Sequence, residues 1–112
     1  METIHLSKAM KVKGEDVQDL ALDFDKITGR VLIETESKCR ALSDGTPDLT
    51  FSMKYQAMLA AKASGVKYDD ILDLGGSDMI LVIAAVKSFL FNPASEAKPE
   101  KPKPFNQETE KA

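Results

Sequence analysis

Apolar and polar residues alternate over residues 1–24, on both sides of a turn signal at Lys13–Asp16. Such alternation is typical of two β-strands joined in a hairpin. A simple pairing across this turn would place the apolar residues of the two strands on opposite faces of the hairpin. We therefore predict a bulge or a looser turn near Val17–Asp19, which returns both sets to one face.

From residue 25 the spacing of apolar residues becomes helical. Asp25 or Thr28 can cap a first helix that runs to about Leu42. Residues at helical spacing predict its inner face, namely Leu32, Thr35, Cys39 and Leu42. The segment 43–48 that follows is rich in Ser, Asp, Gly and Pro, which predicts a loop.

A second helix is predicted over residues 49–65, with Gly65 in the left-handed conformation that often ends helices. A short helical turn follows at residues 67–74. Its apolar residues are predicted to point inward, namely Ile71, Leu72 and Leu74. Gly75-Gly76 then interrupts the helical pattern, and Ser77 can cap the last helix.

The last helix, from about Asp78 to Asn92, carries more apolar surface than one buried face needs. A broad stripe predicted to face the core consists of Met79, Val82, Ile83, Val86, Phe89 and Leu90. A second stripe, at spacing i, i+4, i+7 and i+11, consists of Ile80, Ala84, Lys87 and Phe91. Two strands and three or four short helices can bury the first stripe but have little left to cover the second. The run is also shorter than the roughly 20 apolar residues of a membrane span, so we expect no membrane anchor.

The second stripe is therefore a candidate partner-binding surface, because exposed apolar patches are typical of protein interaction sites. We add Met53 and Met58 of the preceding helix to this surface, since unbranched thioether side chains adapt to many partners. The alternative is that Ile80, Ala84 and Phe91 simply belong to the core.

Length and composition favour one small globular domain, since the chain has 112 residues and 43% of them are hydrophobic. Four of its five prolines lie after Asn92, together with four Lys and four Glu. We predict a domain at residues 1–92 and a disordered Pro/Lys/Glu tail at 93–112. The predicted fold class is α+β, with an N-terminal β-hairpin at 1–24 packed on a small bundle of three to four helices at 25–92.

The net charge of −3 argues against sequence-independent nucleic-acid binding, which needs clustered Lys and Arg to neutralise phosphates. Cys39 is the single cysteine, so an intrachain disulfide is excluded, and such a composition fits a reducing compartment. Residues 1–7 lack the long apolar run of a secretory signal. We therefore expect a cytoplasmic protein.

No group of residues predicts a catalytic, cofactor or metal site. His5, the single histidine, lies in a predicted strand, and Cys39 is most simply a small buried hydrophobe. Gly75-Gly76 lacks the sequence context of the glycine-rich loops that bind phosphate. The acidic residues of Asp69–Asp73 do not have the spacing of a calcium loop, and they suit the start of a helix. We expect a protein without enzymatic activity or a cofactor.

Five short segments are informative through their order, although none has chemical meaning alone. They are IHLSK near the start of the chain, LDFDKITGR, FSMKYQ, AAKASGV and a last helix that ends in SFLF. This order, over residues 1–92, resembles the tail assembly chaperone family of long-tailed bacteriophages and prophages.

The resemblance implies a non-enzymatic protein of the bacterial host cytoplasm. Members of this family are thought to coat a long helical tape-measure protein before tail tube and sheath subunits polymerise around it, and they are absent from the finished virion. Many are made in two lengths by a ribosomal frameshift. The expected partner is thus a tape-measure-like helix, with a homo-oligomer as a further expectation. Two alternatives stay open, a structural tail or baseplate component retained in the particle and a small homo-oligomeric interaction protein.

Overall fold

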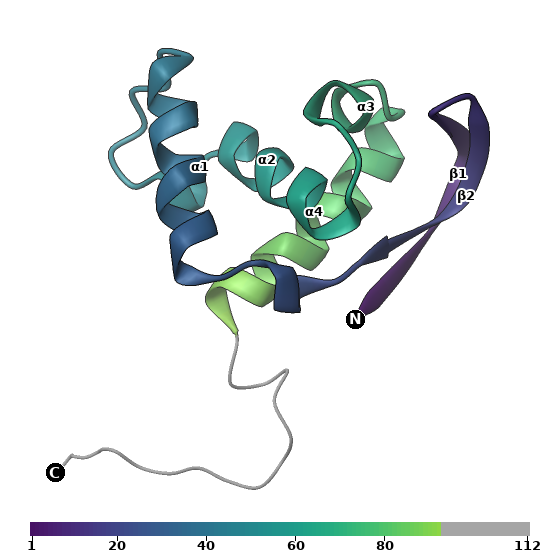
Figure 1. Ribbon diagram of the computed structural model, residues 1–112, viewed down its shortest axis with the longest axis horizontal. Helices are drawn as coiled ribbons and strands as arrows, with labels where there is room; N and C mark the ends of the chain where they lie inside the picture. The colour runs from purple at the N-terminus through teal and green to yellow at the C-terminus, as the bar shows by residue number, and fades with distance from the viewer. Residues whose placement is uncertain (93–112) are drawn as a thin grey trace, which may run out of the picture.

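The computed structural model describes residues 1–92, so the predicted tail at 93–112 lies outside the described residues. A two-stranded antiparallel hairpin packs against four α-helices, which confirms the predicted α+β fold (Figure 1). The strands are β1 (Glu2–Val12) and β2 (Glu15–Leu22). The helices, including two 3-10 turns, are η1 (Phe24–Lys26), α1 (Gly29–Ala41), η2 (Leu49–Phe51), α2 (Met53–Ser64), α3 (Tyr68–Leu72) and α4 (Gly76–Phe91).

The hairpin turns at Lys13 and Gly14, whose φ angles of 53° and 84° are both positive. Two consecutive positive φ angles give the tight turn that matches the twist of the flanking strands. Near the other end of the hairpin Ile4 pairs with Leu20, whereas nearer the turn Met10 pairs with Val17. The pairing therefore shifts between these two points.

The shift is the predicted bulge, but the extra residues belong to β1 and not to Val17–Asp19. Four residues of β1, 6–9, lie opposite Gln18 alone. The Gln18 side-chain amide donates a hydrogen bond of 2.6 Å to the carbonyl oxygen of Leu6. One face of the hairpin is apolar as a result, and its buried residues are Ile4, Leu6, Met10, Leu20 and Leu22.

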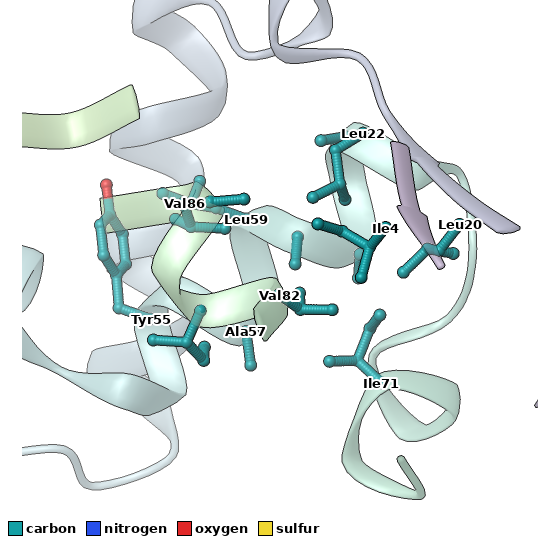
Figure 2. Packing of buried hydrophobic residues seen from close by; sticks show 14 of the residues in the cluster. Ile4, Leu20, Leu22, Tyr55, Ala57, Leu59, Ile71, Val82 and Val86 are labelled. Atoms are coloured by element: carbon teal, nitrogen blue, oxygen red, sulfur yellow. The ribbon is translucent and has the colours of Figure 1, made fainter. Parts of the chain in front are cut away.

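Helix α2 lies at the centre of the fold and contacts α1, α3, α4 and β2 (Figure 1). Many of its positions are small, and its buried residues are Tyr55, Gln56, Ala57, Leu59, Ala60, Ala61 and Ala63. Alanines let neighbouring elements approach the α2 backbone closely while Leu59 fills the space between them. Figure 2 shows Leu59 beside Val82 and Val86 of α4, with Leu22 of the hairpin and Ile71 of α3 completing the core.

Local signals in the sequence place most helix ends correctly. The Thr28 hydroxyl accepts a hydrogen bond from the Val31 N–H (3.2 Å) and thereby caps α1, as predicted. Gly65 closes α2 at φ +75°, and the Val66 N–H folds back to the Ala61 carbonyl at 3.2 Å. This closure satisfies backbone groups that would otherwise be unpaired at the end of the helix.

Three predicted details are wrong. Leu42 is exposed because it follows the last residue of α1, where the helical periodicity no longer directs a side chain inward. Leu72 is exposed because α3 is a single short turn whose inward side carries Ile71, which is fully buried, and Tyr68, which is partly buried. Ser77 does not cap α4, since the helix starts at Gly76 and the extended Gly75 occupies the cap position without a side-chain hydrogen bond.

Candidate partner-binding surface on helix α4

Helix α4 is buried on one side and apolar and exposed on the other. Its inward residues are Val82, Ile83, Ala85 and Val86, with Met79, Phe89 and Leu90 partly buried against the core. Its outward residues are Ile80, Leu81, Ala84, Lys87 and Phe91. Ile80 is 57% exposed and Phe91 is 41% exposed. The small core covers only the inward stripe of the helix, so the outward stripe stays exposed. We refer to the outward residues, with Phe51 and Met53, as the α4 surface.

An aromatic pair extends this surface beyond α4. The rings of Phe51 and Phe91 stack with centroids 5.2 Å apart and an angle of 22° between their planes. Phe51 is 69% exposed in spite of this contact, and Met53 beside it is also exposed. Stacked rings at this separation attract each other, so Phe51 and Phe91 hold one another in place at the C-terminal end of the stripe.

The position of Phe51 is set by hydrogen bonds around η2. The Asp48 carboxylate accepts from the Thr50 N–H at 3.1 Å and from the Thr50 hydroxyl at 2.7 Å. These bonds lower the pKa of Asp48, because they stabilise its ionised form. The buried Gln56 amide donates to the Thr50 carbonyl at 2.7 Å. Phe51 is therefore presented on an ordered turn.

A second network fixes the loop before η2. The Asp44 carboxylate accepts hydrogen bonds from the Ser52 hydroxyl, the Thr46 N–H and the Cys39 thiol. The bond from Ser52 is the main reason that the pKa of Asp44 lies far below its ordinary value. Arg40 closes the same loop by donating to three backbone carbonyls, those of Asp44, Thr46 and Pro47.

This network does not form a nucleophilic site. Cys39 is fully buried, as predicted, and burial together with the neighbouring Asp44 carboxylate raises the pKa of its thiol. A protonated thiol that donates to a carboxylate is a poor nucleophile, since the thiolate is the reactive form. The cluster of Cys39, Asp44 and Ser52 is therefore a loop anchor.

The other end of α4 is tied to the hairpin bulge. Asp78, in the first turn of α4, is buried, and its carboxylate accepts the Ser7 N–H at 2.9 and 3.1 Å and the Ser7 hydroxyl at 3.1 Å. The Ser7 backbone bond is the main cause that lowers the pKa of Asp78. The bulge that restores one apolar face of the hairpin thus also exposes a backbone N–H for α4 to bind.

Five of the six sequence-predicted binding residues are exposed, four of them on α4 and one at the start of α2. The four stripe residues all lie on the outward side of α4, and Met53 is next to the Phe51 turn. Met58 is the exception, because it is partly buried and lines a hollow formed by α1, α2 and α3, to which α4 contributes no residue.

Sequence reasoning missed Leu81, Phe51 and Asp78. Leu81 lies one position from Ile80, so a spacing rule that starts at Ile80 omits it. Phe51 was assigned to a continuous helix, whereas it lies on a separate turn in contact with Phe91. The position of Asp78 in the first turn of α4 has a sequence signal, since a single acidic residue before a long apolar run is typical of a helix start.

Within residues 1–92 no cluster of three or more His, Cys, Asp or Glu is arranged to hold a metal ion. In the same part of the chain, no helix has the length and hydropathy needed to cross a membrane. Comparisons with known protein families, with curated proteins and with solved structures gave no match.

Proposed function

We propose that this chain is a tail assembly chaperone of a phage or prophage, which binds a long tape-measure-like helical protein before the tail tube polymerises. The α4 surface is the binding site in this proposal. The single observation that carries it is the exposure of Ile80, Ala84 and Phe91 in one line along α4, continued by Phe51. The proposal also rests on the resemblance of residues 1–92 to that family.

The shape and chemistry of the surface suit a helical partner. A line of apolar side chains along one helix can pack against the apolar face of a second helix, with contacts repeating every three to four residues. Lys87 is the one charged group within the line, and it can pair with an acidic residue of the partner. The chain then acts as a binding protein of the bacterial cytoplasm and needs no catalytic chemistry.

Ordered surroundings support binding over a role in internal packing. The Asp78–Ser7 bonds and the Asp48 turn hold the two ends of the α4 surface without using any of its apolar side chains. A surface that is fixed in advance loses little conformational entropy when a partner binds. The main alternative, a tail or baseplate component that stays in the particle, would use the same surface as a permanent subunit contact.

Co-expression with the tape-measure-like helical protein that the proposal expects to be encoded beside this chain tests the proposal. The tagged helical protein is purified, and the amount of this chain that co-purifies is measured for the wild type and for Ile80→Glu. We expect several wild-type copies per long chain and a loss of at least about tenfold for Ile80→Glu, because a buried unpaired charge costs more than about 1.4 kcal/mol. Analysis of finished particles separates the two roles, since a chaperone is absent from them and a structural component is present.

Leu42→Glu is the matched control. Leu42 is an exposed leucine at the end of α1, outside the α4 surface, and it receives the same change of charge. Equal loss of co-purification for Leu42→Glu and Ile80→Glu would overturn the assignment of the surface. Failure of the wild-type chain to co-purify with the tagged long chain would overturn the proposed function itself.

A further inference from the structure

A groove of about 370 Å³ lies between α1, η2 and the C-terminal end of α4, and we call it the α1–α4 groove. Its apolar walls include Leu32, Ile33 and Leu90, and the buried residues Leu49 and Tyr55 also line it. Ile33 is 64% exposed, so one apolar wall of the groove is in contact with water. The groove can therefore bury the apolar stem of a side chain that belongs to another molecule.

The charged residues that line the α1–α4 groove are both acidic. Glu36 comes from α1 and Asp48 precedes η2, and no lysine, arginine or histidine lines the groove with them. Within residues 1–92 the side-chain ion pairs are confined to the hairpin, so neither carboxylate has a basic partner there. Two carboxylates beside apolar walls favour a cation that is carried on an apolar stem.

The polar groups of the groove are held in position without a ligand. The Asp48 oxygen Oδ1 accepts both bonds from Thr50, which leaves Oδ2 without a hydrogen bond in the part of the chain that the structure describes. The Tyr55 hydroxyl donates to the Leu32 carbonyl at 3.1 Å, and its oxygen can still accept a bond. Burial raises the pKa of the Tyr55 phenol, and the charges of Glu36 and Asp48 raise it further, so a negative potential reaches into the groove.

We propose that the α1–α4 groove receives an arginine side chain of the helical partner that binds the α4 surface. The groove continues that surface, because Leu90 precedes Phe91 in α4 and Thr50 precedes Phe51 in η2. A helix seated across the stacked rings of Phe51 and Phe91 can place one side chain in the groove while its apolar residues cover the α4 surface. This inference rests on the proposed function for its partner, and it adds the charge that selects that partner.

Arginine suits the groove better than lysine does. The guanidinium group is planar and weakly hydrated, so it can lie against Ile33 and Leu90, and its several N–H donors can serve carboxylates on two sides. A lysine ammonium is strongly hydrated and would lose more of its water beside these walls. An uncharged side chain would leave the two carboxylates without a counter-charge.

A titration followed by amide NMR shifts of the full chain tests the groove in the absence of the partner. The probes are N-acetyl-arginine methylamide and its citrulline counterpart, in which an uncharged urea replaces the guanidinium group. We expect saturable shifts of the Leu32, Glu36 and Thr50 amides with the arginine compound. The citrulline compound should bind at least about fivefold more weakly, and the lysine compound should fall between the two.

A matched pair of variants separates the groove from general attraction to an acidic protein. Glu36→Gln should weaken binding of the arginine compound by about two- to fivefold. Glu34→Gln makes the same change at an exposed residue of α1 that does not line the groove, and it should leave binding unchanged. No shift with the arginine compound, equal binding of the citrulline or lysine compound, or unchanged binding by Glu36→Gln would overturn the inference.

Co-purification with the tape-measure-like protein separates this inference from the proposed function. Glu36→Gln should reduce the amount that co-purifies by about two- to fivefold, which is less than the loss for Ile80→Glu, and Glu34→Gln should not reduce it. If Ile80→Glu loses the long chain while Glu36→Gln and Glu34→Gln both keep it as the wild type does, the inference fails and the proposed function stands. If the wild-type chain does not co-purify, the proposed function fails and the partner's arginine fails with it.

Discussion

The two sides of helix α4 are made from the same kinds of residue and lie in opposite environments. Val82 and Val86 are fully buried against α2, whereas Ile80 and Phe91, on the same helix, are about half exposed. Both sides of α4 carry mostly apolar residues, so hydrophobicity by itself does not identify the buried side. The difference arises because α2 and the hairpin occupy only one side of α4 (Figure 1).

The largest expected effect comes from introducing a charge on the buried side. Val82→Glu should lower the free energy of unfolding by more than about 4 kcal/mol, since an unpaired carboxylate would be placed in the hydrophobic core, where Val82 is fully buried. A loss of that size is comparable to the whole stability of a small domain, so far-UV circular dichroism should show an unfolded chain.

Ile80→Glu is the paired measurement on the exposed side. The same new charge should change the free energy of unfolding by less than about 0.5 kcal/mol, measured by urea denaturation. Similar destabilisation by the two variants would mean that both sides of α4 are buried in solution, and the α4 surface would then be an interface between copies of this chain.

An effect smaller than that of Val82→Glu is expected at the link between α4 and the hairpin. Because the Ser7 N–H stabilises the ionised carboxylate, the pKa of Asp78 in the folded state lies below its ordinary value of 3.8. Such a group contributes stability above its unfolded pKa and loses that contribution as the pH falls through the folded pKa. Asp78→Asn should therefore lower the melting temperature at neutral pH by several degrees.

The same variant should also show a weaker dependence on acid. Wild-type melting temperature should fall between about pH 5 and pH 2, and Asp78→Asn should reduce this fall without removing it, because Asp44 and Asp48 also have lowered pKa values. Identical pH profiles for the two proteins would show that the Ser7 bonds contribute nothing to stability in solution.

A small loss of stability is expected at the aromatic pair. Phe51→Ala removes the stacked ring from Phe91 and should cost about 0.5–1.5 kcal/mol at most, because both rings remain partly in water. Co-purification with the helical partner should fall by a larger factor than stability does. A loss of stability above this range with binding intact would make the pair a packing contact.

Much of the fold follows from local patterns. Alternation predicts the hairpin, Thr28 and Gly65 mark the ends of their helices, and the stripe that contains Val82 and Val86 is correctly assigned to the core. Each of these features depends on neighbours in the chain, through the strand period, a capping hydrogen bond or the helical repeat. The predicted burial of Leu42 and Leu72 is wrong because both residues lie where the helical repeat stops.

The candidate surface was only partly predictable. The outward stripe of α4 has a sequence signal, and its four residues do share one exposed side. Nothing local indicates that Phe51 stacks on Phe91 or that Met58 lines a hollow between α1, α2 and α3. These relations join residues from different elements, so they depend on how the helices pack.

The sequence alone determined which segments are strands and helices, where most of them end, and that α4 carries two apolar stripes. Only the tertiary structure decided which stripe is covered, where the β1 bulge lies, and that the bulge gives its Ser7 N–H to Asp78. The physical reason is the distance along the chain over which each kind of interaction acts. Backbone hydrogen bonds and side-chain periods act between near neighbours, whereas burial depends on which distant segments fill the limited space beside each helix.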